Sequence, residues 1–251
     1  MMTTERRSLI LDRLHRDGRL VAKDLAGEFG LSEDTIRRDL RDMAAEGLLA
    51  RVHGGALPLQ PSLPDFAARK QVASDEKKRL GRLAATLVGA GDTVFLDGGT
   101  TNAEIARALP AGIALTVITH SPTIAGEFEH SAGVEIVLIG GRIYKHSMVA
   151  VGAAASAAIA TLRPDIFFLG ATAAHPLHGF STGDFEEAAI KRQIAGQSAR
   201  TYVALTAEKL GHASPVTIMP LDAATGVLLS DEADPEQAEM LGAAGIEMLR
   251  A

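Results

Sequence analysis

Three short segments at the start of the chain carry apolar residues at helical spacing. The apolar positions recur three or four residues apart: Ile10 and Leu14, Leu25 and Phe29, and Ile36, Leu40 and Met43. We therefore predict helices over residues 4–17 and 22–29 and a third that begins after Ser32. Gly18 suits the end of the first helix and Gly30 the turn between the other two, because glycine readily adopts a left-handed backbone conformation.

A strand-like segment ending in Gly54-Gly55 follows the third helical segment. Helix, turn, helix and β-wing in this order are the sequence form of a winged helix-turn-helix. In that fold the recognition helix enters the major groove of DNA. We therefore predict a winged helix-turn-helix domain over residues 1–57 that binds double-stranded operator DNA.

The polar face of the third helix has side chains suited to DNA. Ser32 can cap the helix, and three arginines fall away from the apolar stripe. Hydroxyl groups can bind phosphates or base edges, and the arginine fork suits guanine edges and phosphates. The candidate DNA-binding residues are Ser32, Thr35, Arg37, Arg38 and Arg41 in the helix, with Arg51 and His53 in the wing.

An alternative for this face is a solvated helix surface with ion pairs four residues apart, such as Arg38–Asp42. Glu33, Asp34 and Asp39 are expected to share that exposed surface. Residues 1–57 hold ten basic and ten acidic residues, so the net charge of −6 belongs to the rest of the chain. A neutral domain can still bind phosphates when its charges segregate by face.

The second half of the chain alternates apolar runs with helical segments. The runs are nearly continuous, as in strands covered on both faces: 93–97, 115–120, 134–140, 166–171, 201–205, 215–221 and 226–230. Helical segments are expected near 102–109, 122–131, 149–162, 184–199 and 235–244. This order predicts an α/β fold with a doubly wound sheet. Ser74 is expected to cap a further helix before the first strand.

The segment PLQPSLPD, residues 58–65, holds three prolines and interrupts both kinds of pattern. We predict a linker over residues 58–74 and an effector-sensing α/β domain over residues 75–251. The absence of cysteine excludes disulfides. The charged start of the chain and the lack of a long apolar run predict a cytoplasmic protein that does not enter the membrane.

Glycines and polar residues gather where the predicted strands end. The first strand runs into Gly98-Gly99-Thr100-Thr101 and a helix, a combination that can bind an anion through free backbone N–H groups and hydroxyls. A structural helix cap is the alternative for this turn. The histidines His120, His146, His175, His178 and His212 lack metal-ligand spacing, so we expect no metal site. Glu187 and Lys191 could form a surface pair.

Near its start the chain carries the segments SEDTIRRDL and EGLLARVHGGAL, and further on FLDGGTT, VITHS, VLIGGRI, FLGAT, STGDFEEAAIKR and EKLG. In these segments it resembles the DeoR family of bacterial transcriptional regulators. It implies a second domain related to ribose-5-phosphate isomerase. It also implies that a sugar-phosphate pocket is formed by Asp97, Gly98, Gly99, Thr100, Thr101, Ser121, Gly140, Gly141, Gly170, Lys191 and Lys209. The chain departs from the usual family pattern at His120 and in the segment 206–209.

The function implied by this resemblance is a regulator, normally a repressor, of a carbohydrate operon. It would be a homodimer or homotetramer that responds to a phosphorylated sugar or related metabolite and needs no cofactor. An isomerase-like enzyme with an added DNA-binding module is the alternative, with Asp97, Glu186, Glu187 and Lys191 as possible acid–base groups. The loop after the fourth predicted strand has no carboxylate before Asp184, which argues against the enzyme. An activator, or a regulator with a ligand that is not phosphorylated, is the third possibility.

Overall fold

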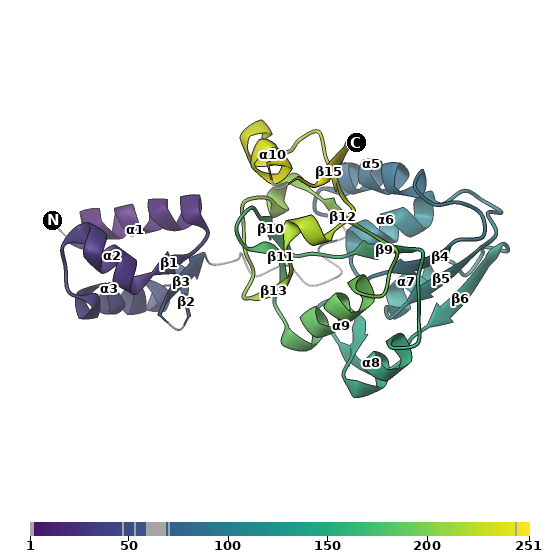
Figure 1. The fold of residues 1–251 in the computed structure, drawn as a ribbon, viewed down its shortest axis with the longest axis horizontal. Helices are drawn as coiled ribbons and strands as arrows, with labels where there is room; N and C mark the ends of the chain where they lie inside the picture. Colours follow the sequence, from purple (N-terminus) through teal and green to yellow (C-terminus); the bar gives the residue numbers. More distant parts are fainter. Residues whose placement is uncertain (1–2, 47, 53, 59–68, 70, 244) are drawn as a thin grey trace.

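The protein has a small N-terminal unit and a larger C-terminal unit (Figure 1). A computed structural model describes residues 3–46, 48–52, 54–58, 69, 71–243 and 245–251. Most of the predicted linker therefore lies outside the described residues. None of the helices in the described ranges is long and apolar enough to cross a membrane.

The N-terminal unit is a winged helix-turn-helix, as predicted. Its elements are α1 (Thr3–Asp17), β1 (Leu20–Val21), α2 (Ala22–Phe29), α3 (Glu33–Ala45), β2 (Leu49–Val52) and β3 (Gly55–Pro58). The three strands form an antiparallel sheet in the order β1-β3-β2. Ile10, Leu14, Leu25 and Ile36 pack in its core with the other apolar residues of the predicted stripes.

Local sequence explains the turn between α2 and α3. Gly30 has φ 63°, a left-handed conformation that a glycine adopts without a steric cost. Ser32 caps α3 by accepting a hydrogen bond from the backbone N–H of Thr35. The expectation that Asp39 is exposed was wrong. Its carboxylate is buried and forms an ion pair with Arg6 of α1, with Nε and Oδ2 2.6 Å apart.

A seven-stranded parallel sheet forms the centre of the C-terminal unit. Its strands are β4 (Thr93–Leu96), β5 (Leu115–Thr119), β6 (Val134–Leu138), β9 (Ile166–Leu169), β12 (Arg200–Leu205), β14 (Gly226–Leu229) and β15 (Glu247–Arg250). Their spatial order is β15-β14-β12-β9-β4-β5-β6. From β4 the following strands β5 and β6 are added toward one edge of the sheet, and from β9 the strands β12, β14 and β15 are added toward the other edge. The switch point of the sheet therefore lies between β4 and β9, where such folds bind ligands.

Helices cover both faces of this sheet. One buried cluster joins the strands to α5 (Ser74–Ala85), α6 (Thr100–Ala108) and α7 (Pro122–Gly126). The other joins them to α8 (Ala153–Ile159), α9 (Phe185–Ala195) and α10 (Pro235–Gly242). Successive residues of a strand point to opposite faces, and accordingly Val94 and Leu96 belong to the first cluster and Phe95 to the second. The predicted doubly wound α/β architecture is thus present.

Several predicted elements differ in the structure. The run 215–221 contains β13 (Val216–Met219), which pairs outside the parallel sheet, in the order β10-β11-β13 with β10 (Ala173–His175) and β11 (Gly179–Thr182). The predicted helix 149–162 begins as a strand, β8 (Val149–Val151), paired with β7 (Arg142–Tyr144). Ser74 is the first residue of α5 and makes no cap, because Ala73 holds the cap position in a left-handed conformation.

Candidate functional site

A cavity opens at the carboxyl ends of β4 and β9, at the switch point of the sheet. Its volume is about 330 Å³, within the range of small-molecule binding sites. The loop after β4, the start of α6, the loop after β9, the helix α9 and the segment after β12 form its wall. Its polar lining side chains are Arg69, Lys77, Thr100, Thr101, Asn102, Ser147, Thr172, Glu187, Lys191, Glu208, Lys209 and His212.

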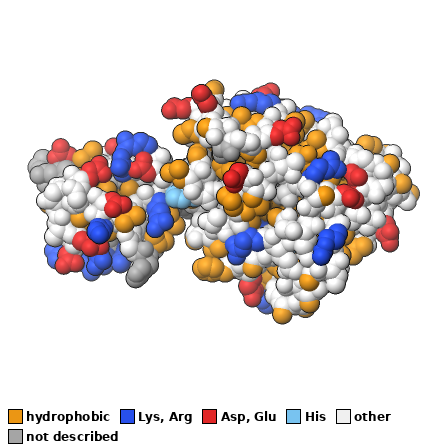
Figure 2. Space-filling model, in the orientation of Figure 1, with side chains coloured by type: hydrophobic (Ala, Val, Ile, Leu, Met, Phe, Trp, Pro, Cys, Tyr) orange, Lys and Arg blue, Asp and Glu red, His pale blue; other side chains and the backbone are white. Residues whose placement is uncertain are grey.

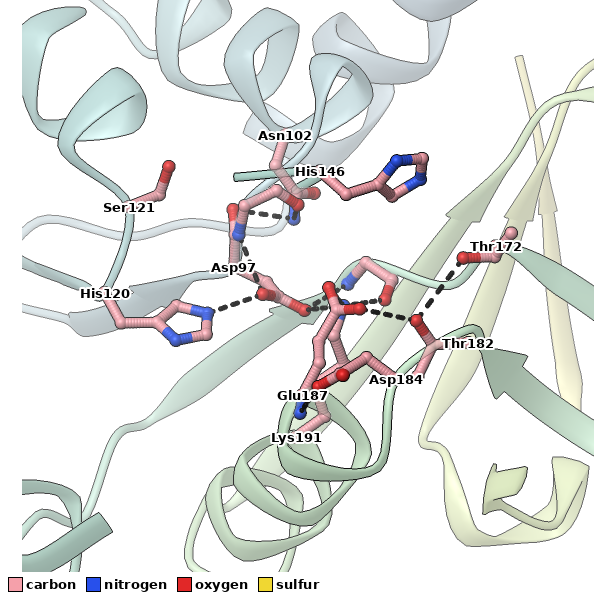
Figure 3. Close-up of polar contacts among 12 residues, drawn as sticks. Asp97, Asn102, His120, Ser121, His146, Thr172, Thr182, Asp184, Glu187 and Lys191 are labelled. Atoms are coloured by element: carbon pink, nitrogen blue, oxygen red, sulfur yellow. Dashed lines mark hydrogen bonds and ion pairs between the residues drawn. The ribbon is translucent and has the colours of Figure 1, made fainter. Parts of the chain in front are cut away.

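A fully buried carboxylate lies beneath the cavity floor. Asp97 follows β4 and accepts hydrogen bonds from the backbone N–H groups of Gly98 and Gly170, at 2.7 and 2.8 Å. Its Oδ1 is 2.7 Å from Nε2 of His120, and its Oδ2 is 2.9 Å from Nζ of Lys191 (Figure 3). Burial alone would raise the pKa of Asp97, but Lys191 and His120 hold that pKa well below its usual range.

Lys191 joins Asp97 to a second buried carboxylate. Its Nζ lies 3.2 Å from Oε1 of Glu187, and both side chains are almost completely withdrawn from solvent. The idea of a surface pair between them was therefore wrong. Thr182 donates a hydrogen bond of 2.6 Å to the other oxygen of Glu187 (Figure 3). Burial would lower the pKa of Lys191, but the two carboxylates raise it, so the Lys191 ammonium is charged and already paired on both sides.

The start of α6 offers hydrogen-bond donors to the cavity. Gly99 has φ 120°, a conformation that favours glycine, and it is the N-cap residue of α6. Thr101 lines the cavity and is 6% exposed. Among the described residues its Oγ1 has no hydrogen-bond partner. A buried hydroxyl without a partner is costly, and an anion at the helix N-terminus would satisfy it.

Cationic side chains form another part of the wall. Lys77 of α5, Arg69 before that helix and Lys209 after β12 all line the cavity. Burial and the neighbouring charge of Lys77 lower the pKa of Lys209 to about 8. Glu208 is a carboxylate on the same side. Lys191 is paired with the two carboxylates Asp97 and Glu187. The other charged side chains of the lining are three cations, Arg69, Lys77 and Lys209, and one carboxylate, Glu208, so this part of the wall has an excess of positive charge.

Seven of the eleven predicted effector-binding residues line this cavity: Gly98, Gly99, Thr100, Thr101, Gly170, Lys191 and Lys209. Asp97 lies below the floor and contacts the lining residues Lys191, Gly98 and Gly170. The other three are outside the lining, contrary to the expectation: Ser121, Gly140 and Gly141. Ser121 follows β5, the neighbour of β4, and the two glycines follow β6, the edge strand of the sheet.

The two departures from the family pattern have different positions. His120 is fully buried and bonds to Asp97 and to the backbone oxygen of Ala150, so it supports the floor without lining the cavity. Glu208 and Lys209, from the other departing segment, do line it. Sequence reasoning missed Arg69, Lys77 and Asn102. Lys77 lies on the helix before the first strand, and lysine side chains on helices are ordinarily exposed to solvent. Its sequence position therefore gave no reason to place it in a cavity.

The predicted histidines occupy several environments. His175 and His178 stack with ring centroids 4.6 Å apart, and burial with nearby His178 lowers the pKa of His175 to about 4. His146 lies on the β7–β8 turn near the cavity (Figure 3). Across the described ranges, no group of three or more His, Asp or Glu side chains is arranged to hold a metal ion.

The candidate DNA-binding residues lie on α3 and the wing. The hydroxyls of Ser32 and Thr35 are 2.9 Å apart, at the N-terminus of α3. Arg37 pairs with Glu33 at 2.8 Å, whereas Arg38 and Arg41 are exposed. Arg51 is exposed on β2. His53 lies outside the described residues.

The proposed pair Arg38–Asp42 is replaced by other contacts. Asp42 lies 3.7 Å from Arg7 and 3.9 Å from Arg41. Acidic and basic side chains are interspersed on the visible face of the N-terminal unit, on the left of Figure 2. Any DNA affinity of this unit therefore depends on where individual arginines lie, and its net charge contributes little.

Two family models match the chain. The model described as the DeoR-like helix-turn-helix domain matches residues 6–61, and the DeoR C terminal sensor domain matches residues 72–232. The second match alone covers more than half of the chain. The protein is therefore a DNA-binding transcriptional regulator with a C-terminal sensor domain. It belongs to the DeoR family, a family of regulators and not of enzymes.

Individual relatives align along most of their length. The chain is 28% identical to a putative aga operon transcriptional repressor of Escherichia coli O157:H7, covering 98% of this chain and 93% of that protein. It is 30% identical to the transcriptional repressor GlcR of Bacillus subtilis, covering 99% and 96%. It is 29% identical to the glycerol-3-phosphate regulon repressor of Escherichia coli K12, covering 87% of both chains.

Solved structures also match parts of the chain. Ribose 5-phosphate isomerase A from Methanocaldococcus jannaschii matches with a TM-score of 0.40 and 16% identity, covering 55% of this chain and 54% of that chain. The full-length sorbitol operon regulator SorC from Klebsiella pneumoniae matches with a TM-score of 0.44 and 11% identity, covering 93% and 98%.

Proposed function

We propose that the protein represses a carbohydrate-metabolism operon and that a phosphorylated sugar, bound in the cavity, changes its affinity for operator DNA. The observation that carries this proposal is the cavity itself. The Thr101 hydroxyl, which has no partner in the part of the chain that the structure describes, a helix N-terminus and excess positive charge meet at this cavity, in a chain that also contains a winged helix-turn-helix.

The DNA contacts are assigned to α3 and the wing. Ser32 and Thr35 are at the helix N-terminus, and the exposed Arg38 and Arg41 are available for guanine edges or phosphates. Arg37 contacts DNA after exchange of its pair with Glu33, and Arg51 with His53 follows the backbone from the wing. We assign this role to a domain of residues 1–57, joined by residues 58–74 to a sensor domain of residues 75–251.

The ligand chemistry follows from the groups that line the cavity. Thr100, Thr101 and Lys209 offer hydroxyl, backbone and ammonium donors that suit a phosphate. Glu187 and Thr172 supply acceptors that suit sugar hydroxyls. The names of relatives that repress the aga operon and the glycerol-3-phosphate regulon support a carbohydrate-linked, phosphorylated effector.

Regulation requires a difference between two states. A ligand shifts DNA binding only if it binds one arrangement of the domains or subunits better than another. We propose a homodimer or homotetramer whose recognition helices contact half-sites about 34 Å apart or at multiples of that spacing. A gel-shift titration with a panel of sugar phosphates tests the proposal, and an operator affinity unchanged by all of them contradicts it.

A further inference from the structure

The segment that leads from the DNA-binding unit into the sensor domain contributes to the cavity wall. Arg69 and Val72 both line the cavity, yet they precede the first helix of the sensor domain, α5. Only residues 59–68 separate Arg69 from the end of β3, the last strand of the wing. A ligand in the cavity would therefore lie against the connection between the two domains.

Three hydrogen bonds hold this end of the connection at the cavity. Lys77, which is 3% exposed, donates from its ammonium to the backbone oxygen of Arg69 at 2.8 Å and to that of Val72. The Arg69 guanidinium donates through Nη2 to the backbone oxygen of His146 at 2.5 Å. His146 adjoins Ser147, another residue of the lining. Both the backbone and the side chain of Arg69 are thus positioned by cavity residues.

The charges around Arg69 favour an anion. Lys77 and Lys209 are its cationic neighbours along the wall, and Glu208 and Glu187 are the carboxylates that line the cavity with it. Lys191 is already paired with Asp97 and Glu187. A guanidinium presents several N–H donors in a planar fork that matches the oxygens of a phosphate.

We propose that Arg69 is a direct ligand of the effector's phosphate and makes the connection between the domains part of the effector site. This inference rests on the proposed function, because it assumes that the cavity binds a phosphorylated ligand. The phosphate lies between the N-terminus of α6, at Thr101, and the three cations Arg69, Lys77 and Lys209. Occupied and empty proteins then differ in the contacts of Arg69, which supplies the difference in affinity that control of DNA binding requires.

The first test measures binding of inorganic phosphate and of glycerol 3-phosphate to the full chain by isothermal titration calorimetry. Arg69→Gln removes the charge and the fork, and we expect it to weaken binding by about 10- to 100-fold. Arg69→Lys keeps the charge and should recover part of that loss. Arg82→Gln is the matched control, because Arg82 is exposed on α5 and should leave the affinity unchanged.

The outcomes separate this inference from the proposed function. If the wild-type chain binds neither probe nor any sugar phosphate, the proposed function fails and the role of Arg69 fails with it. If the wild-type chain binds and Arg69→Gln binds equally well, only the role of Arg69 is overturned. Thermal unfolding without ligand checks that Arg69→Gln is folded, and the loss of the phosphate-induced rise in its midpoint repeats the measurement independently.

The second test concerns the connection between the domains. An operator selected from random-sequence DNA is bound by wild-type and Arg69→Gln proteins, and each is then saturated with the same phosphorylated ligand. We expect the wild-type affinity for DNA to change and that of Arg69→Gln to change by less than half as much. An equal change in both proteins at saturation would show that ligand binding alters DNA affinity without Arg69 and would overturn this role.

Discussion

Lys191 and Asp97 lie 2.9 Å apart beneath the cavity, and each is almost completely buried. Glu187 lies 3.2 Å from the same ammonium, so one cation serves two carboxylates. Removing one partner of a buried ion pair leaves a charge without compensation. The group therefore fixes α9 against the loops after β4 and β9, and through these loops it fixes the shape of the cavity floor.

Asp97→Asn should destabilise the sensor domain by about 1–3 kcal/mol, because the neutral amide loses the charge-assisted hydrogen bond to Lys191, although Lys191 stays paired with Glu187. Chemical unfolding followed by circular dichroism measures the change. Lys78→Met is the control: Lys78 pairs with Asp75 on the surface, and its loss should cost less than about 1 kcal/mol. Equal effects of both substitutions would show that the buried group contributes no more than a surface pair.

The same group predicts a dependence of stability on pH. The pKa of Asp97 is lowered in the folded protein, so its stabilising effect is fully present above the unfolded value of about 3.9 and is lost as the pH falls below it. The difference in unfolding free energy between wild type and Asp97→Asn should be constant from pH 7 to 5 and shrink below about pH 4. A difference that persists unchanged to pH 3 would contradict this assignment.

Arg38→Ala should weaken operator binding by about 1–3 kcal/mol if Arg38 contacts a base edge. Fluorescence anisotropy with labelled operator measures the affinity. Arg163→Ala is the control, because Arg163 is exposed in the sensor domain after α8. An affinity within experimental error of wild type would assign Arg38 to the solvated face of α3.

The double substitution Thr100→Ala and Thr101→Ala should leave operator binding intact and abolish the response to the effector. Both hydroxyls line the cavity, and that of Thr101 has no partner among the described residues, so its removal should not destabilise the fold. Thr86→Ala, on the exposed end of α5, is the control. Loss of operator binding by the double variant would mean that this loop is structural.

The affinity for a phosphorylated effector should decrease between pH 7 and 9. The pKa of Lys209 is lowered to about 8, so its ammonium is mostly charged at neutral pH and mostly neutral at pH 9. A phosphate ester remains a dianion throughout, because its second pKa is about 6. Calorimetry across this range should give a flat profile for Lys209→Met and a falling one for wild type and for Lys145→Met, a surface control. A flat wild-type profile would contradict the role of Lys209.

The sequence predicted the elements that rest on local patterns. Helical spacing of apolar residues located α1, α2 and α3, and the cap at Ser32 depends only on Thr35, three residues away. Continuous apolar runs located the central strands, because a parallel sheet is buried on both faces. The turn at Gly98-Gly99 was also predictable from local sequence, because glycine adopts backbone conformations that other residues disfavour.

Features set by distant contacts were not predictable in this way. Asp39 has the spacing of a surface residue, and only the approach of Arg6 from α1, 33 residues away, buries it. Strands of three residues, such as β7 and β10, carry too short a pattern to recognise. The place of Arg69 in the cavity depends on hydrogen bonds from Lys77 of α5 to the backbone of Arg69 and Val72. Gly140 was misplaced because its strand, β6, lies at the sheet edge.

The central claim is that one chain couples operator binding to a phosphorylated metabolite in the cavity at the switch point. The most direct measurement is the operator affinity of the full chain, determined with and without each member of a panel of sugar phosphates and their unphosphorylated counterparts. The account predicts that at least one phosphorylated compound changes the affinity by about 5- to 150-fold, that its unphosphorylated form does not, and that the Thr100→Ala and Thr101→Ala double variant fails to respond. An operator affinity that no phosphorylated compound alters, or that the unphosphorylated form alters equally, would contradict it.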